Sequence, residues 1–135
     1  MLQLASLRRG ETLYDLGAGD GRIIIEASRH FGANAVGVEV DPRWVSRIKE
    51  RLTSTGTKAE VIEENIFEVN LTSADVVTIY LSPSANARLA PKLQSELKQG
   101  TRVVSLDYTL PGWTPLREIT VTASGIPRKL YLYKV

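Results

Sequence analysis

The sequence predicts an α/β fold in which a mostly parallel β-sheet is closed by a C-terminal antiparallel hairpin. Over the first two-thirds of the chain, short apolar segments alternate with segments whose apolar residues recur at helical spacing. After Pro111-Gly112 two further apolar segments follow one another with only a short connection, as in a hairpin. This pattern within 135 residues indicates one domain, residues 1–135.

The predicted strands are short, apolar and bounded by glycine or other turn-forming residues. Those of the parallel part are residues 12–16, 35–40, 59–62, 75–81 and 102–106. The hairpin is predicted from residues 116–122 and 129–135. Because the strands of a parallel sheet all run in one direction, their carboxyl ends are expected at one edge, where such sheets bind ligands.

Three connecting segments have helical periodicity: residues 21–31, 42–52 and 85–98. Asp41 is a typical N-cap residue, and Pro42 occupies the first helical position, where its missing N–H does no harm. Gly100 is expected to cap the third helix at its C-terminal end.

The composition excludes several classes of function. The chain has no cysteine and a single histidine, His30, so we expect no disulfide, no thiolate chemistry and no metal site. It lacks both a long apolar run and a secretory N-terminus, which favours a cytoplasmic protein without a membrane partner. A net charge of +2 and the lack of a basic, aromatic stripe do not favour a nucleic-acid partner. We expect a monomer.

The most informative motif is the glycine-rich turn Gly17-Ala18-Gly19-Asp20-Gly21, directly after the first strand. Glycines here let a ligand approach the backbone closely and let the helix begin tight against the sheet. A dinucleotide fingerprint has the spacing G-x-G-x-x-G, but here the third glycine comes one residue early and Arg22 takes its place. The turn therefore predicts a nucleotide-like ligand other than a dinucleotide.

Two carboxylates define that ligand further. Asp15 ends the first strand, where it would repel a pyrophosphate but would suit the cationic amino group of a methionine moiety. Glu39 ends the second strand, 22 residues beyond Gly17, where a carboxylate can accept hydrogen bonds from both ribose hydroxyls. Together they favour S-adenosylmethionine as the cofactor. The alternative is another nucleotide-binding protein in which Asp15 only caps a helix.

Two later segments complete the predicted site. Asn65-Ile66 follows the third strand, where Asn65 could hydrogen-bond to the edge of adenine while Ile66 packs on its face. A turn role for Asn65 is equally consistent with the sequence. Tyr80-Leu81-Ser82-Pro83 ends the fourth strand across from the glycine turn. The methyl group and its acceptor are expected to meet there.

These residues resemble a known group. Asp15 to Arg22, followed by Gly37 to Pro42, is similar to the first motif and second strand of class I methyltransferases, which have a Rossmann-like fold. The later stretches, Ile79 to Pro83 and Leu110 to Trp113, resemble the small archaeal protein-lysine methyltransferases. They also resemble the mitochondrial relatives that modify the ATP synthase c-subunit and the adenine nucleotide carrier.

The resemblance implies a role for each site residue. It places Asp15 and the Gly17-Ala18-Gly19 backbone around the methionine part, Glu39 and Val40 at the ribose, and Asn65-Ile66 near adenine. It also implies a catalytic Tyr80 that touches the cofactor. The acceptor would lie against Leu81, Ser82, Pro83 and Trp113.

The sequence departs from relatives in two ways. Many amino and amide methyltransferases carry Asn-Pro-Pro-Tyr or Asp-Pro-Pro-Tyr where this chain has Tyr80-Leu81-Ser82-Pro83, so that chemistry is less expected. Relatives also carry extra N-terminal residues over the cofactor, so we expect either a more open site or an incomplete chain. We therefore predict an S-adenosylmethionine-dependent protein-lysine methyltransferase. The alternatives are an RNA or small-molecule methyltransferase and a non-catalytic S-adenosylmethionine-binding module.

Overall fold

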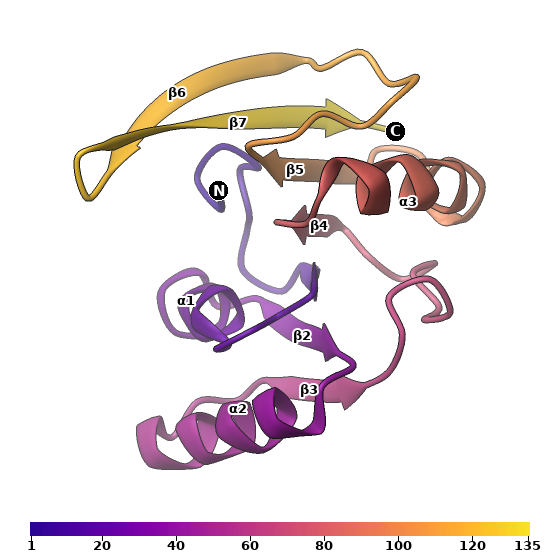
Figure 1. Ribbon diagram of the computed structural model, residues 1–135. Helices are drawn as coiled ribbons and strands as arrows, with labels where there is room; N and C mark the ends of the chain where they lie inside the picture. Colours follow the sequence, from indigo (N-terminus) through magenta and orange to yellow (C-terminus); the bar gives the residue numbers. More distant parts are fainter.

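The computed structural model describes residues 1–135 and contains one seven-stranded sheet with the strand order β3-β2-β1-β4-β5-β7-β6. The strands are β1 (Thr12–Leu16), β2 (Asn34–Glu39), β3 (Glu60–Glu63), β4 (Val76–Ile79), β5 (Arg102–Leu106), β6 (Arg117–Ala123) and β7 (Ile126–Lys134). The helices are α1 (Arg22–Phe31), α2 (Pro42–Thr55) and α3 (Pro83–Glu96). Figure 1 shows β6 and β7 as a long arm at one end of the sheet.

The first five strands are parallel and the last two are antiparallel, which confirms the predicted fold class. Strand β1 lies at the centre, between β2 and β4, and Asp15 is in register with Gly37 on one side and Thr78 on the other. Because β7 runs against the parallel strands, its first residues lie at the edge where those strands end. The hairpin turn therefore projects toward the ligand-binding edge.

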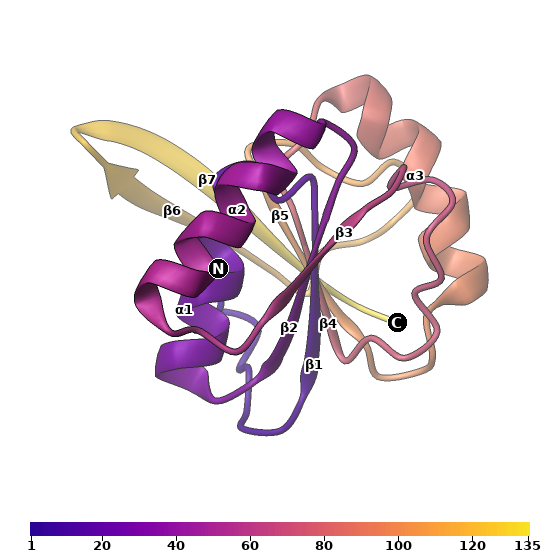
Figure 2. The same ribbon diagram turned by 90° about the horizontal axis from the view of Figure 1, so that it is seen from below.

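Helices cover both faces of the sheet. Figure 2 shows α1 and α2 on one face and α3 on the other. The predicted cap of α2 is confirmed: the Asp41 side chain accepts a hydrogen bond from the Arg43 N–H at 2.9 Å, and Pro42 follows it. Helix α3 begins in the same way, because the Ser82 hydroxyl accepts the Ala85 N–H at 3.1 Å. These caps fix the segments that leave β2 and β4 at the ligand edge.

The core has two parts, one on each face of the sheet. On the α3 face, Leu89 and Leu93 pack with Leu16, Ile79 and the fully buried Tyr133. On the opposite face, a second buried cluster joins α1 and α2 to the sheet and to the N-terminal segment. Its members include Leu2, Ala5, Leu7, Leu13, Ile24, Ala27, Ile48, Val104, Leu130 and Leu132. None of the helices is long and apolar enough to span a membrane.

Arg102 anchors the N-terminal segment to the sheet. Its guanidinium donates to the carbonyl oxygen of Ala5 at 3.0 Å and pairs with the Glu11 carboxylate at 2.7 Å. Hydrogen bonding to Arg102 lowers the pKa of Glu11 to about 2. The segment that precedes β1 is thereby held against the α1 face and reaches the ligand edge through Met1.

Several predicted boundaries were wrong, among them the end of the fourth strand, which is Ile79 and not Leu81. Helix α3 ends at Glu96 with Leu97 as its C-cap, whereas Gly100, with φ of 91°, serves the turn into β5 and donates its N–H to Val135. The second helix continues to Thr55 and ends at Gly56. The hairpin turn is tighter than predicted, since Ser124 and Gly125, both with positive φ, suffice to reverse the chain.

The arm formed by β6 and β7 extends beyond the rest of the sheet. Strand β5 pairs only with residues 130–134 of β7, whereas β6 pairs with β7 from residue 126 onward. Pro127 is tolerated in this stretch because no strand lies on the other side of β7 to require its missing N–H. The free part of the arm carries Arg128 and Ala123 to the ligand edge.

Gly37→Ala tests the packing of β2 against the glycine-rich turn. A Cβ at this position would lie 2.9 Å from the Ala18 Cβ and 3.2 Å from the Ile24 Cδ1, so the turn must shift. We expect urea denaturation to give a free energy of unfolding lower by about 1–3 kcal/mol, the usual effect of overpacking. The double variant with Ala18→Gly should recover part of this loss. Strict additivity of the two substitutions would contradict the packing argument.

Candidate functional site

A cavity of about 490 Å³ lies at the carboxyl ends of β1, β4 and β5, under the hairpin arm. Its wall combines the glycine-rich turn, the first turn of α1 and residues from both ends of the chain. The lining residues are Met1, Asp15, Gly17, Ala18, Gly19, Asp20, Arg22, Ile23, Trp44, Ile79, Tyr80, Leu106, Ala123 and Arg128. This is the edge at which an open parallel sheet binds its ligands.

Asp15 lies at the floor of the cavity and is only 6% exposed. Burial raises the pKa of its carboxyl group to about 7, and the nearby Asp20 and Glu39 carboxylates act in the same direction. The Thr78 hydroxyl donates a hydrogen bond to the Asp15 Oδ1 at 2.8 Å and opposes that rise. An ionised Asp15 therefore lacks a cationic partner within the chain, and a bound cation would stabilise it.

Thr78 was missed in the sequence analysis. It lies in β4 between apolar residues and is fully buried, in register with Asp15. A buried hydroxyl needs a hydrogen-bond partner, so a threonine within an apolar strand was the available signal. The pairing of β4 with β1 supplies the partner, and no local pattern shows that pairing.

Glu39 fastens the glycine-rich turn to the end of β2. Its Oε1 accepts the Gly19 N–H at 3.0 Å, and its Oε2 accepts the N–H groups of Val40 and Asp41, both at 3.1 Å. The Gly17 N–H donates to the carbonyl oxygen of Val38 at 2.9 Å. These bonds preorganise the turn, and Oε1, which accepts only one of them, still has lone-pair capacity for a ligand hydroxyl.

The turn requires glycine at two positions, for different reasons. Gly17 has φ of 80°, and a Cβ at this position would lie 3.1 Å from the Leu81 side chain. Gly19 also has a positive φ, and its added Cβ would meet only the Gly17 carbonyl oxygen at 4.0 Å. Glycine is needed here for backbone conformation and, at Gly17, for the close approach of the segment after β4.

Tyr80 lies at the cavity, whereas the three residues after it make structural contacts. Tyr80 lines the wall and is 56% exposed. Leu81 packs beside Gly17, Ser82 is the N-cap of α3 and Pro83 is its first residue. These last three residues hold Tyr80 between a strand end and a helix start, close to the predicted acceptor position.

Arg128, which lines the cavity, forms a second polar group with Asp107 at the end of β5. The Arg128 guanidinium binds both carboxylate oxygens of Asp107, with its shortest N–O distance at 2.6 Å, and lies 5.1 Å from the centre of the Tyr80 ring. Hydrogen bonding to Arg128 lowers the pKa of Asp107. No sequence signal predicted that these two residues pair, because only the antiparallel hairpin brings them together.

Glu39 lies behind the cavity wall, against Gly19, and the remaining predicted residues also lie outside the wall. The Asn65 Oδ1 accepts the Phe67 N–H at 2.9 Å, which is the turn role that the sequence left open, and Ile66 packs against the core. Val40 is 65% exposed beside Glu39. Trp113 packs edge-to-face on Tyr133, with the ring centres 5.8 Å apart, on the α3 face. Ligand contacts for these residues, as for the other predicted site residues, stay predictions.

Apolar residues from distant parts of the chain complete the wall. Met1 and Ile23 line the cavity together with Trp44, which is 36% exposed on the first turn of α2. The N-terminal segment thus reaches the site that was expected to be open on that side. No local signal in the sequence marks Met1 or Trp44 as a lining residue, because both positions depend on packing across the sheet face.

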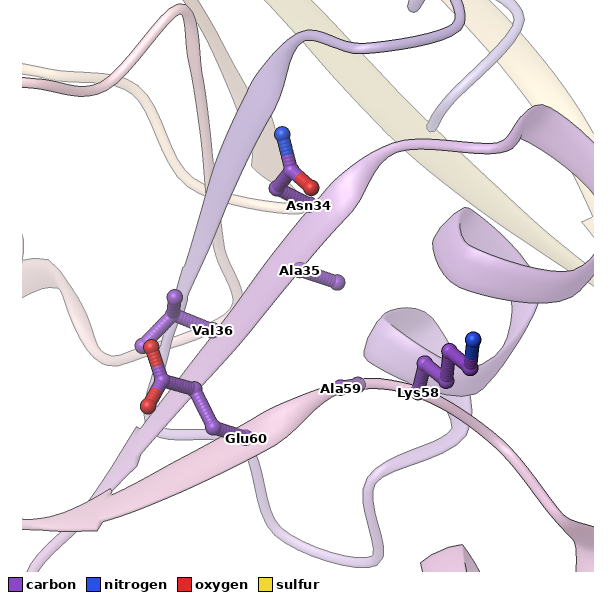
Figure 3. A pocket seen from close by; sticks show the side chains of 6 residues that line it. All are labelled: Asn34, Ala35, Val36, Lys58, Ala59 and Glu60. Atoms are coloured by element: carbon purple, nitrogen blue, oxygen red, sulfur yellow. The ribbon is translucent and has the colours of Figure 1, made fainter.

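A second hollow lies away from this site. Figure 3 shows it between the start of β2, at Asn34 to Val36, and the segment Lys58 to Glu60 that leads into β3. It lies at the amino ends of these strands, the edge opposite to the glycine-rich turn. It contains no buried carboxylate and no glycine, so it offers none of the chemistry found at the carboxyl edge.

The chemistry of the cavity fits a cationic nucleoside. One end of the site holds a buried carboxylate without a cation, and the other holds a carboxylate that closes the glycine-rich turn. Two arginines line the wall, and each is already paired with an aspartate: Arg22 with Asp20 and Arg128 with Asp107. The wall therefore leaves no free guanidinium for a pyrophosphate, and it suits a ligand with an amino group and a ribose.

Comparison with known proteins agrees with this geometry. The chain is 39% identical over 138 residues to a protein-lysine N-methyltransferase of Saccharolobus islandicus (strain REY15A), and the match covers 100% of this chain and 86% of that protein. It is 35% identical to the adenine nucleotide translocase lysine N-methyltransferase of Mus musculus, over 91% of this chain. The match covers 54% of the mouse protein, so the chain spans about half of that relative.

A solved structure supports the same relationship. The crystal structure of an RNA methyltransferase from Salinibacter ruber in complex with S-adenosyl-L-homocysteine superimposes with a TM-score of 0.90 and 40% identity. The match covers 98% of this chain and 86% of that one. Residues 15–117 match the ANTKMT methyltransferase domain, from the buried carboxylate of β1 to the start of β6. With fold, glycine-rich turn and sequence in agreement, the chain belongs to the ANTKMT methyltransferase domain family.

Proposed function

We propose that this chain transfers a methyl group from S-adenosylmethionine to lysine side chains of proteins. The observation that carries the proposal is the cavity at the strand ends, where Asp15 is buried without a cationic partner and each wall arginine is paired with an aspartate. Such a cavity favours a cationic donor over a phosphate-rich ligand. The lysine methyltransferase relatives support the same acceptor.

The donor would lie along the carboxyl ends of β1 and β2. Asp15 would bind the ammonium of the methionine part, beside the backbone of the Gly17-Ala18-Gly19 turn. Glu39 would accept hydrogen bonds from the ribose hydroxyls, with Val40 next to it. Asn65-Ile66 would lie at the adenine, which the exposed ring of Trp44 could also cover. Asp15, the turn and Glu39 are held in place by hydrogen bonds within the chain.

The acceptor would enter beside Tyr80. When bound, S-adenosylmethionine supplies a methyl group on an activated sulfonium, so the chain need not provide a nucleophile. The Tyr80 ring would form an aromatic wall for the lysine stem, and its hydroxyl would orient the amine. Leu81, Ser82 and Pro83 would border the same opening, with Trp113 further along the α3 face. The work of these residues is alignment and exclusion of water.

RNA is the second candidate acceptor because the Salinibacter ruber relative is described as an RNA methyltransferase. An RNA site usually combines free cations for phosphates with aromatic platforms for bases. Here Arg22 and Arg128 are engaged by Asp20 and Asp107, which weakens that reading. The relatives that act on lysine and the paired arginines together favour protein. We further propose a monomeric, cytoplasmic, archaeal-like enzyme with one domain over residues 1–135.

Asp15→Ala and Glu39→Ala test the donor site. Each substitution should weaken S-adenosylmethionine binding by about 1.5–3 kcal/mol, the range for a lost hydrogen bond to a charged group. Glu39→Ala should also lower the melting temperature, because Glu39 holds the N–H groups of Gly19, Val40 and Asp41. Isothermal calorimetry measures the affinities, with Glu26→Ala on the exposed side of α1 as control. Unchanged affinity in both folded variants would contradict the donor assignment.

Donor binding should depend on pH through Asp15. The pKa of its buried carboxyl group is about 7 in the free protein, and only the ionised form attracts the ammonium. Below pH 7 the protonated form accumulates, so the dissociation constant should rise about tenfold per pH unit. Asp15→Asn, which resembles the protonated form, should bind weakly with little change from pH 5 to 7.5. A flat profile in the wild-type protein would contradict this assignment.

The acceptor can be identified by chemistry. Purified protein is incubated with methyl-labelled S-adenosylmethionine and a cell extract, and the extract is then digested with protease or with nuclease. We expect protease to release the label and mass spectrometry to locate it on lysine. The rate should rise with pH toward the lysine pKa, since only the neutral amine attacks. Label found only on RNA or small molecules would overturn the lysine proposal.

A further inference from the structure

Arg128 lies where the hairpin arm crosses the mouth of the cavity. Its guanidinium is 5.1 Å from the centre of the Tyr80 ring, and both residues line the cavity wall. Tyr80 belongs to neither core cluster and is 56% exposed, so the core packing leaves its ring free to rotate. The guanidinium over its face therefore provides a contact that can fix the ring at the end of β4.

Arg128 is itself held firmly. Its Nε donates to the Asp107 Oδ1 at 2.9 Å and to Oδ2 at 3.0 Å, and a terminal nitrogen donates to Oδ2 at 2.6 Å. Asp107 has φ of 69°, a conformation that aspartate tolerates better than most residues, and its N–H donates to the Lys129 carbonyl oxygen at 2.7 Å. The end of β5 and the arm are thus joined by both side-chain and backbone hydrogen bonds.

The segment after Asp107 is fastened to α3. The Asn86 Nδ2 donates to the carbonyl oxygens of Tyr108 at 3.3 Å and Thr109 at 3.1 Å, and the Ser105 hydroxyl donates to that of Tyr108 at 2.5 Å. Asn86 is fully buried in the first turns of α3, the helix that begins three residues after Tyr80. The strand end that carries Tyr80 and the loop that holds Arg128 therefore share one rigid support.

The geometry of the Arg128 guanidinium matters more for the Tyr80 ring than its charge does. Asp107 neutralises the guanidinium at hydrogen-bond distance, so the pair presents a dipole and not a net charge to the acceptor. A dipole loses strength with distance faster than a charge does, and it would shift the pKa of an incoming amine little. The planar guanidinium, held at two points, is suited instead to keep an aromatic ring in one orientation.

We propose that Arg128 is a positioning residue that, held by Asp107, orients Tyr80 for methyl transfer. The inference rests on the proposed function, in which Tyr80 aligns the acceptor amine. It assigns the C-terminal arm a part in the reaction: the arm supplies the group that sets the angle of the Tyr80 ring. Lys129, the next residue, lies on the opposite side of β7 and pairs with Glu118, so it has no part in this contact.

The test compares Arg128→Gln and Arg128→Lys with Lys129→Gln, a matched loss of one cation on the same strand. Arg128→Gln should lower kcat about tenfold and leave the donor dissociation constant within about twofold, because ring orientation matters in the transition state. Arg128→Lys keeps the charge but not the bidentate geometry, and should lose nearly as much. Lys129→Gln should match the wild type.

A double-variant cycle shows whether Arg128 acts through Tyr80. With Tyr80→Phe the hydroxyl is already lost, so adding Arg128→Gln should lower kcat by less than about twofold more. NMR of tyrosine-labelled protein supplies a readout apart from activity, with the Tyr80 signals assigned by their loss in Tyr80→Phe. Arg128→Gln should shift and average the Tyr80 ring signals, while Lys129→Gln should leave them in place.

Several results would overturn the inference. Independent, multiplicative losses in the cycle would mean that Arg128 acts apart from Tyr80, and weakened donor binding would make it a donor ligand. Higher activity in Arg128→Gln would mean that the guanidinium obstructs the acceptor. Unchanged kcat would remove the role altogether. A wild-type protein that methylates no protein lysine contradicts the proposed function, and the Tyr80 ring signals then report on the contact separately.

Discussion

The buried carboxylate of Asp15 is the constraint on which the site depends. It ends the central strand, in register with Thr78, whose hydroxyl is its hydrogen-bond partner. Its pKa of about 7 lies well above the ordinary value of 3.8, so ionising it in the folded protein costs on the order of 4 kcal/mol. Because the pKa is raised in the folded state, the free energy of unfolding decreases as the pH rises from about 4 to about 7, where Asp15 ionises. A bound cation would offset this loss, so the buried carboxylate favours a cationic ligand.

The rest of the site follows from that position. A ligand cation can reach Asp15 only if the next turn has no side chains in the way, and Gly17 and Gly19 meet this need with positive φ angles. The turn must also keep its conformation without a side chain that occupies the ligand's space. Glu39 stabilises it by accepting the Gly19 N–H. The antiparallel hairpin brings Arg128 to the same edge, so the last part of the chain closes a site begun by its first strand.

Local signals made much of this predictable. The glycine-rich turn, the two strand-end carboxylates and the Asp41 cap are all features of adjacent residues. Thr78, Met1 and Arg128 could not be found in this way, because each reaches the cavity through strand pairing or packing between residues far apart in the sequence. The wrong cap at Gly100 has a similar cause: its N–H bonds the carbonyl oxygen of Val135, at the other end of the chain.

The ionisation of Asp15 tests this account most directly. Carbon-13 NMR of the Asp15 carboxyl group can follow its titration in the free protein and with S-adenosylmethionine bound, using Asp15→Asn to assign the signal. The account predicts a midpoint near pH 7 in the free protein, as burial requires, and a carboxylate that stays ionised well below that pH in the complex. A midpoint near that of an exposed aspartate, unchanged by the donor, would contradict it.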